Sequence, residues 1–408
     1  MSMKVISGGV CAAKGFKAGG VHCGVKASSR PDKNDLAMIL SERECTAAAT
    51  YTLNRVKAAP IYVTMAHLED GVAWGVVANS GNANACCPLS HENAEAMCAA
   101  AAAATGHEAH DFAVASTGVI GQTINIAAIE EGMPWVAAAL TEDGSDSAAN
   151  AIMTTDTVKK EIAVSFEVGG KEVKLGAIAK GSGMIHPNMG TMLGFLTTDC
   201  AITHEMLEDA LREVVSKTFN RVTVDGDTST NDTCLILANG MAGNPEITSD
   251  GEAFAVFMQA LNTLTVALCR MIAGDGEGAT KLLECIVTGA DDEQTAKTCA
   301  KSVICSSLLK AAMFGADANW GRVLCAIGYS GAKVDVNKIG VSFRSAKGEI
   351  VVCVNGAGVP FSEEIAKEIL LEKEIDILVS LGDGSYGASA WGCDLTYDYV
   401  KINGDYRT

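Results

Sequence analysis

The sequence predicts a layered α/β (α+β) fold made of two closely packed units of mixed sheet and helices. Its 408 residues are too many for one small core, so two units are the reasonable expectation. Segments with strand-like alternation are interspersed with segments of helical period along the chain. The chain is 48% hydrophobic, with 42 glycines and only 7 prolines, which is typical of a compact globular protein.

The clearest strand signal lies in the middle of the chain. Apolar side chains alternate over residues 162–168 and again over 173–177, and Gly169-Gly170 lies near the middle of the whole stretch. This pattern predicts a hairpin with a two-residue turn, whose second strand leads to Lys180. A shorter apolar run, Phe112–Ala115, is a further strand candidate.

Helical spacing dominates after residue 199. Apolar residues recur every three or four positions over 207–219, with Thr203 as the expected N-cap. A longer helix is expected from Glu252 to about Ile272, ending at the glycine-rich turn 274–278. Another helix is expected to start near Ala279.

The last part of the chain mixes both signals. Residues 341–343 and 350–354 flank a short polar turn and predict another hairpin. Ser362 is expected to cap a helix that runs through Glu372.

Composition excludes several classes of protein. A formal charge of −18 without a stripe of Lys and Arg argues against nucleic-acid binding. We find no segment long enough to span a bilayer and no N-terminal secretory signal, so we expect a cytoplasmic protein without membrane contact. The 15 cysteines suit a reducing compartment. His107 and His110 lack thiol or carboxylate companions at ligand spacing, so we expect no metal site.

The most informative segment runs from Lys180 to Asp199. It is rich in glycine, contains Pro187, and places Thr191 directly after the small residue Gly190. A threonine in such a turn can attack the preceding carbonyl and cut its own chain. The cut would give Thr191 a free α-amine, and an N-terminal threonine is a nucleophile that carries its own base. The alternative is an ordinary loop threonine.

Glycine-rich turns elsewhere have two interpretations each. The segment Gly274–Lys281 lacks the spacing of a phosphate-binding loop and is either a plain turn or a turn that presents the Glu277 carboxylate to a cationic amine. Ser116–Gly121 follows a strand candidate and either simply ends it or offers a hydroxyl and a backbone amide as an oxyanion hole.

Two further segments are dense in turn-forming polar residues. Asn79–Asn84 and Asp225–Asp232 are either solvated loops or segments that line a pocket or support its walls. No Gly-x-Ser-x-Gly motif is present, which argues against a Ser-His-Asp hydrolase of that kind.

Taken together, these segments resemble one family, the ornithine acetyltransferase / glutamate N-acetyltransferase enzymes of arginine biosynthesis. The resemblance covers essentially the whole chain in order, through residues 12–16, 33–37, 78–84, 116–121, 151–157, 180–199, 225–233, 274–281 and 315–322. One departure is Gly190, where the family usually has alanine. Because glycine is also small and adopts strained backbone angles readily, cleavage is still expected.

The resemblance implies a precursor that cuts itself between Gly190 and Thr191. Residues 1–190 would form an alpha chain and residues 191–408 a beta chain, which stay together and are expected to pair again into a heterotetramer. Thr191 would be the nucleophile, and Thr117 and Gly118 the oxyanion hole. The implied substrate contacts are Thr154 or Thr155, Lys180, Thr191, Glu277, Asn403 and Thr408.

The implied reaction is a double displacement. The acetyl group of N2-acetyl-L-ornithine passes to Thr191, ornithine leaves, and L-glutamate then takes the acetyl group. Lys180 would bind the substrate carboxylate and Glu277 the side-chain amine. No metal or bound organic cofactor is needed, and the use of acetyl-CoA as a second donor is left open. The alternatives are an N-terminal-nucleophile aminopeptidase or amidase, which passes the acyl group to water, and a non-catalytic binding or scaffold protein.

Overall fold

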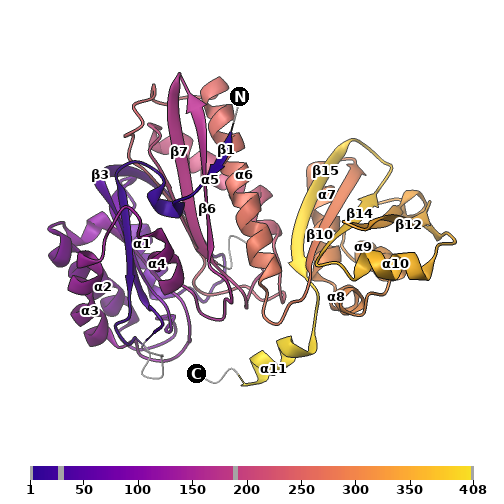
Figure 1. Cartoon of the computed structure of the whole chain (residues 1–408), viewed down its shortest axis with the longest axis horizontal. Coiled ribbons are helices and arrows are strands. Elements are labelled where there is room, and N and C mark those ends of the chain that lie inside the picture. The colour runs from indigo at the N-terminus through magenta and orange to yellow at the C-terminus, as the bar shows by residue number, and fades with distance from the viewer. Residues whose placement is uncertain (1–2, 26–31, 187–191, 406–408) are drawn as a thin grey trace. The chain divides into compact units, whose positions relative to one another are not determined.

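The computed structural model describes residues 3–25, 32–186 and 192–405 (Figure 1). The chain divides into two compact units. The first consists of Met1–Gly181, Pro187–Asn220 and Thr228–Leu268, and the second of Ser182–His186, Arg221–Asp227 and Cys269–Thr408. The first unit therefore contains residues from both sides of the predicted cut at 190/191, so that division into alpha and beta chains stays a prediction about processing.

The first unit is built on a nine-stranded sheet. Its strands are β1 (Lys4–Ile6), β2 (Phe16–Val21), β3 (Leu36–Tyr51), β4 (Val72–Asn79), β5 (Phe112–Ser116), β6 (Lys160–Val168), β7 (Lys171–Lys180), β8 (Leu193–Thr198) and β9 (Thr233–Ala238). They follow the order β1-β6-β7-β8-β9-β3-β4-β5, and β2 pairs with β3. Most neighbours are antiparallel, but β4 with β5 and β8 with β9 are parallel.

The long strand β3 joins two halves of this sheet. Its first part pairs with β4, its last part pairs with β9, and the register with β4 shifts between Leu40 and Cys45. One buried core contains Ile39 and Ala113 from the first half together with Phe195 and Leu235 from the second half. The sheet therefore folds over, and its two halves enclose a common apolar layer.

Helices complete the first unit. They are α1 (Ala59–His67), α2 (Ser90–Thr105), α3 (Ile126–Ala138), α4 (Ser145–Ala151), α5 (His204–Lys217) and the part of α6 (Glu252–Gly274) up to Leu268. Side chains of α1, α2 and α3 form a second core with Met38, Val77 and Val114. On the other half of the sheet, Phe166 of β6 meets Phe257 of α6 edge to face.

Among the described residues, α6 is the one helix long and apolar enough to span a membrane by length and composition. Its burial is one-sided: Phe257, Leu261, Leu264 and Leu268 are buried, whereas Gln259 and Asn262 are exposed. A helix packed on a protein core shows this pattern.

The second unit is built on a six-stranded sheet. Its strands are β10 (Leu282–Ala290), β11 (Gly340–Ser345), β12 (Gly348–Val354), β13 (Ala357–Gly358), β14 (Glu374–Ser380) and β15 (Tyr386–Cys393), in the order β13-β12-β11-β14-β10-β15. Its helices are α7 (Glu293–Cys305), α8 (Ser307–Phe314), α9 (Trp320–Gly328), α10 (Glu363–Leu370) and α11 (Tyr397–Asp405). Apolar side chains of α7 to α10 share one core with the inner face of this sheet, which includes Cys285, Phe343 and Ile377.

The predicted mixed α/β class is confirmed, and so are most predicted elements. Gly169 and Gly170 both have positive φ and form the turn between β6 and β7. Thr203 accepts a hydrogen bond from Met206 N and Ser362 from Ile365 N, as N-caps do. The α10 helix ends at Leu370, two residues before the predicted end.

One predicted element is wrong. Residues after Ala279 form strand β10 and not a helix, so the 274–278 turn joins a helix to a strand. The run Leu282-Leu283-Glu284-Cys285-Ile286-Val287 is almost continuously apolar and pairs on both sides, parallel with β14 and antiparallel with β15. Its burial alternates, with Leu283, Cys285 and Val287 buried and Glu284 and Ile286 partly exposed, but the alternation is hard to see in the sequence because Ile286 on the more exposed face is also apolar.

Candidate active site

The predicted junction lies in the connection between two paired strands. Lys180, the last residue of β7, pairs with Leu193, the first residue of β8, and Leu193 pairs in turn with Thr233 of β9. Gly190 and Thr191 belong to this connection and lie outside the described residues, as does Thr408. The strands that flank the junction are therefore fixed in the middle of the first sheet.

Lys180 lies in a buried cluster of charges in the first unit. Its Nζ is 3.8 Å from Asp156 Oδ2, while Asp156 Oδ1 accepts hydrogen bonds from Lys160 Nζ at 2.7 Å and from Gly181 N at 2.7 Å. The side chains of Asp156 and Lys160 are both fully buried. Asp156 therefore balances two buried lysines and fixes the backbone where β7 ends.

The electrostatics of Asp156 follow from these partners. Burial by itself raises the pKa of the Asp156 carboxyl, but Lys180 and Lys160 lower it more, so the net pKa lies well below the usual value. The carboxylate form is thus strongly favoured in the folded protein.

Thr117 and Gly118 follow directly after β5, on a turn that is held at both ends. Thr117 N donates to Asn79 O at 3.0 Å, and Ala83 N donates to Val119 O at 2.8 Å. In the part of the chain that the structure describes, neither the Thr117 hydroxyl nor the Gly118 N–H donates a hydrogen bond. Both groups remain available to a developing oxyanion, as the predicted role requires.

Gly118 is needed at its position for two reasons. Its φ is +133°, and a Cβ there would lie 2.4 Å from Gly81 C and 2.6 Å from Asn82 N. The backbone of the 79–84 segment therefore packs directly against Gly118. The Asn79–Asn84 segment therefore lies directly against the turn that carries Thr117 and Gly118, and its predicted role in a pocket or its walls stays a prediction.

Asn231 ties this turn to the strand next to the junction. Its Nδ2 donates to Ala83 O at 2.6 Å and to Ser116 O at 2.8 Å, and its Oδ1 accepts from Thr230 Oγ1 at 2.5 Å. Asn231 lies two residues before β9, which pairs with β8. A single buried amide thus links the Thr117–Gly118 turn to the strand pair that follows the junction.

Thr154 and Thr155 are half-buried and lie just before Asp156. Thr154 N donates to Asp156 Oδ2 at 3.1 Å, and the carbonyl of Thr154 accepts from Lys33 Nζ at 2.9 Å. The backbone of this segment is therefore held next to the Lys180 cluster. The choice between the two threonines as the substrate contact stays open.

The second unit carries Glu277 and Asn403, and the structure brings them together. Asn403 Nδ2 donates to Glu277 Oε2 at 2.8 Å, and Glu277 N donates to Ser182 O at 3.0 Å. Gly183 packs against the carboxyl, since a Cβ there would lie 2.3 Å from Glu277 Cδ. Glu277 is 8% exposed and makes no ion pair with any described residue. A buried carboxylate without a protein cation suits the binding of a ligand ammonium group.

The field around Glu277 is negative. Burial raises the pKa of the nearby Tyr399 phenol, and the carboxylates of Asp225, Glu277 and Asp227 raise it further. Asp225 itself accepts hydrogen bonds from Met184 N at 2.7 Å and Ile185 N at 2.8 Å. This part of the Asp225–Asp232 segment therefore supports the backbone after Ser182.

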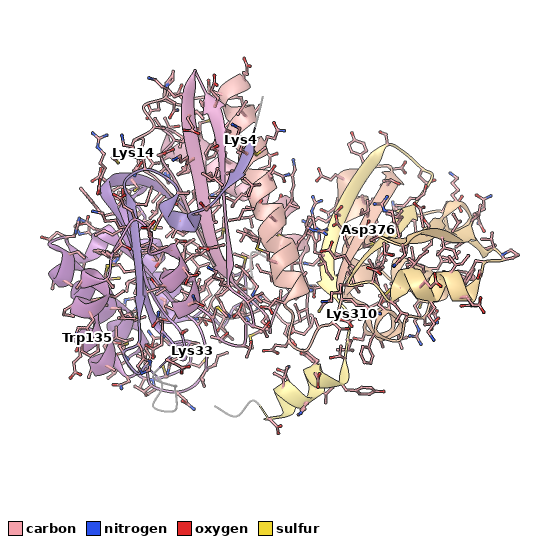
Figure 2. All side chains as sticks on the ribbon, in the orientation of Figure 1. Lys4, Lys14, Lys33, Trp135, Lys310 and Asp376 are labelled. Carbon is pink, nitrogen blue, oxygen red and sulfur yellow. The ribbon has the colours of Figure 1, made fainter. Side chains whose placement is uncertain are left out.

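A buried lysine fixes the same segment from the other side. Lys310, labelled in Figure 2, is 4% exposed and donates to the carbonyl of Val224. Lys310 thus holds the backbone directly before the Asp225–Asp232 segment, and the predicted place of that segment in a pocket or its walls stays a prediction.

Sequence reasoning missed two residues of this arrangement. Asp156 and Asn231 were part of quoted segments, but nothing in their local sequence assigns them a role. Asp156 forms an ion pair with Lys180, which is 24 residues away in the sequence. Asn231 donates a hydrogen bond to the carbonyl of Ser116, which is 115 residues away. The one available signal for Asp156 was the pair Lys159-Lys160 that follows it.

The described residues contain no group of three His, Cys, Asp or Glu side chains placed to hold a metal ion. His107 instead packs against Trp74, with ring centroids 4.8 Å apart and the ring planes tilted by 54°. The expectation that no metal takes part stays a prediction.

The chain is similar to known proteins over nearly its whole length. Its sequence matches the ArgJ family over residues 17–408. Arginine biosynthesis bifunctional protein ArgJ of Caldanaerobacter subterraneus subsp. tengcongensis is 48% identical over 407 residues, which covers 100% of each chain. ArgJ 1 of Clostridium acetobutylicum is 49% identical over 394 residues, or 96% of each chain. The crystal structure of ArgJ from Bacillus halodurans is 47% identical, with a TM-score of 0.51, and covers 53% of this chain and 100% of that chain.

Replacing Gly118 by alanine is expected to lower turnover at least 100-fold. The new Cβ must push the 81–82 backbone away and so displace both oxyanion donors, and loss of one such donor costs roughly 10²–10³ in rate. The measurement is kcat together with the thermal unfolding midpoint.

The matched control for this change is Gly121→Ala. Gly121 also has positive φ, at +82°, but no atom lies within 4 Å of a Cβ there. It should lose about 1 kcal/mol of stability from backbone strain and keep its turnover. Equal turnover in both variants would remove Gly118 from the oxyanion hole.

Replacing Asp156 by asparagine is expected to destabilise the fold by about 3 kcal/mol, because it removes the buried carboxylate that pairs with the buried Lys160 ammonium group at 2.7 Å. The pKa of Asp156 is lowered in the folded state. Its stabilising effect is therefore complete above the unfolded-state pKa of about 4 and is lost as the pH falls through the folded-state pKa. Urea unfolding at several pH values checks both points.

Asp146→Asn is the control for the Asp156 variant. Asp146 forms an exposed ion pair with Lys159, the neighbour of Lys160, and its removal should cost less than about 1 kcal/mol. If Asp156→Asn lowered the free energy of unfolding by no more than Asp146→Asn does, Asp156 would not be the stabilising counter-charge of the buried lysines.

Proposed function

The chain belongs to the ArgJ family, and on that premise we propose that it transfers the acetyl group of N2-acetyl-L-ornithine to L-glutamate through an acetyl-threonine at Thr191. The family predicted from the sequence is thereby confirmed, and with it an acetyltransferase of arginine biosynthesis. The observation that carries the proposal is the match over residues 17–408, combined with a similarity that spans the full length of the relatives.

The first step of the proposal is self-cleavage between Gly190 and Thr191. The two products would have 190 and 218 residues (408 − 190), and 218 of 408 is 53%. The solved chain of the Bacillus halodurans relative also covers 53% of this chain and is itself covered completely. The matched length therefore equals the length proposed for the beta chain.

Acetyl transfer then follows from the chemistry of an N-terminal threonine. The Thr191 hydroxyl attacks the acetyl carbonyl, and its own α-amine accepts the proton. The charge that develops on the carbonyl oxygen is stabilised by the Thr117 hydroxyl and the Gly118 N–H, which have no other acceptor among the described residues. Ornithine leaves with the proton, and the α-amine of glutamate takes the acetyl group from the ester.

Substrate recognition is assigned to charged groups that the fold has already removed from water. Lys180 would bind the substrate carboxylate, with Thr154 or Thr155 and Thr408 as further contacts. Glu277, held by Asn403, would bind the side-chain ammonium group of ornithine. Charge-assisted hydrogen bonds of this kind are shorter and stronger than neutral ones.

The proposal needs no metal and no bound organic cofactor, because the nucleophile carries its own base. Whether acetyl-CoA serves as a second donor depends on contacts that the named residues do not decide. We further propose that the alpha and beta chains stay together, pair into a heterotetramer and act in the cytoplasm.

Thr191→Ala is expected to remain a single chain of 42.2 kDa without acetyl transfer, because one hydroxyl serves both reactions. The unmutated protein should give two species by intact mass under denaturing conditions, the larger one beginning Thr-Met-Leu. Thr191→Ser is the matched control and should still be cut and still transfer acetyl groups, since it keeps the hydroxyl.

The same preparations separate the alternatives. An N-terminal-nucleophile aminopeptidase or amidase would release free acetate from N-acetylornithine without glutamate. A binding or scaffold protein would bind acetylated amino acids without turnover and stay uncut. Normal processing of Thr191→Ala would show that the nucleophile is a different residue.

Glu277→Gln is expected to lower kcat/KM for N-acetylornithine roughly 10- to 100-fold, since a hydrogen bond to a charged group contributes about 1.5–3 kcal/mol. The loss should appear mainly as a higher KM for N-acetylornithine, because glutamate has no side-chain amine. Self-cleavage should be unaffected.

Glu364→Gln, at an exposed position on α10, is the control. It should leave the KM for N-acetylornithine and the KM for glutamate unchanged. If Glu277→Gln also abolished self-cleavage, Glu277 would belong to the processing machinery and not to the ammonium site.

A further inference from the structure

Helix α7 in the second unit carries a row of side chains that the proposed transfer reaction does not use. Glu293, Lys297, Lys301 and Cys305 follow one another at intervals of four residues. Side chains four residues apart are neighbours on a helix surface, with about 5–6 Å between their Cβ atoms. Apolar residues of α7 lie in the core of the unit, whereas Lys297, Lys301 and Cys305 are half-buried. The row therefore lies at the border between the core and the surface.

Residues 221–223 of the same unit extend the second sheet at its edge. Val222 forms a parallel bridge with Trp391 of β15, and Thr223 N donates to Trp391 O at 2.9 Å. Side chains alternate along an extended segment, so Arg221 and Thr223 share the face opposite to Val222.

The side chains of Arg221 and Thr223 connect this segment to both ends of the row. At the N-terminal end of α7, Arg221 Nη2 donates to Glu293 Oε1 at 2.6 Å. At its C-terminal end, His186 Nδ1 lies 3.1 Å from Thr223 Oγ1 and 3.5 Å from Cys305 Sγ. The segment and the helix are thus fixed to each other on either side of the two middle positions of the row.

Both middle positions are lysines. Lys297 and Lys301, together with Arg221, place three cations along this border, and the nearby Glu293 already pairs with Arg221. Lys297 donates no hydrogen bond to any residue that the structure describes. The chain as a whole has a formal charge of −18, so this local excess of positive charge runs against the overall composition.

The two ammonium groups are held under unfavourable conditions. Burial lowers the pKa of Lys297, and the charge of Arg221 lowers it further, whereas Glu293 raises it by a smaller amount. Burial also lowers the pKa of Lys301, and the charge of Lys297 adds to this effect. Half-buried cations that repel one another are stabilised by an anion placed between them.

We propose that Lys297 and Lys301 form a binding site for a dianion of the phosphate class beside residues 221–223. Two ammonium groups about one helical turn apart supply the two positive charges that such a dianion neutralises, and lysine binds phosphate as a point charge. Arg221 stays paired with Glu293 and adds to the positive potential. These residues are not among those assigned to acetyl transfer, so the site does not rest on the proposed function.

Calorimetric titration of the full chain with inorganic phosphate tests the site. Ionic strength is held constant with sodium chloride, because salt screens the attraction between partly exposed charges. We expect saturable binding with a Kd on the order of 1 mM or tighter. Lys297→Gln and Lys301→Gln should each weaken binding at least 10-fold, the lower end of what one hydrogen bond between charged groups contributes.

Lys367→Gln is the matched control. Lys367 is an exposed lysine on α10 in the same unit, and its variant should bind phosphate with the unmutated Kd. Lys297→Arg keeps the positive charge and should bind phosphate more tightly than Lys297→Gln does. Circular dichroism and cooperative thermal unfolding establish that each variant is folded.

A parallel titration with coenzyme A identifies the source of the phosphoryl group. Coenzyme A binding that weakens in Lys297→Gln and Lys301→Gln, but not in Lys367→Gln, would assign the site to a phosphoryl group on a larger molecule. The same pattern with inorganic phosphate alone would assign it to the free ion. If neither probe bound, or if the unmutated protein and both lysine variants bound equally well, the proposal would be overturned and the proposed acetyl transfer would be unaffected.

Discussion

The hydrogen bonds of the Asn231 side chain are the contact on which the predicted oxyanion hole depends. β3 bends so that the two halves of the first sheet face each other, and Asn231 connects them by donating to Ala83 O and Ser116 O. The turn with Thr117 and Gly118 belongs to one half, and the β8–β9 pair after the junction belongs to the other. Because a buried amide that loses its partners costs about 1–3 kcal/mol, this connection also favours one arrangement of the two halves.

Each unit buries a carboxylate, Asp156 in the first and Glu277 in the second, and the two differ in their partners. In the first, Asp156 compensates Lys160 and Lys180, so a cation is kept at the end of β7 without an unpaired charge. In the second, the buried Glu277 carboxylate accepts a hydrogen bond from the Asn403 amide and pairs with no cation among the described residues. The ammonium group of the proposed ligand would supply the cation that Glu277 lacks among the described residues. The buried charge thus has a structural role at Asp156 and, in the proposed function, a ligand-binding role at Glu277.

Local sequence predicted what local physics determines. The Gly169-Gly170 turn, the N-caps Thr203 and Ser362, and the strand before Thr117 required only neighbouring residues to be recognised. Strand β10 was mistaken for a helix because its partly exposed face also carries an apolar residue, Ile286, so the sequence shows little of the alternation in its burial. The bend in β3 and the partners of Asn231 could not be predicted, because they join segments far apart in sequence. Residue roles at Thr117, Glu277 and Asn403 came from family resemblance, and the structure added the contacts that support them.

The strand order has a consequence for how the two pieces of a cut chain are held. In the series β7-β8-β9-β3, the outer two strands precede residue 190 and the inner two follow it, so each piece would supply strands that the other needs. Either piece alone would expose long unpaired sheet edges, which are sites of aggregation. Cutting also turns folding into an association of two polypeptides, whose stability rises with protein concentration by mass action. The uncut chain would fold first as a single molecule, and the break would follow in a sheet that is already complete.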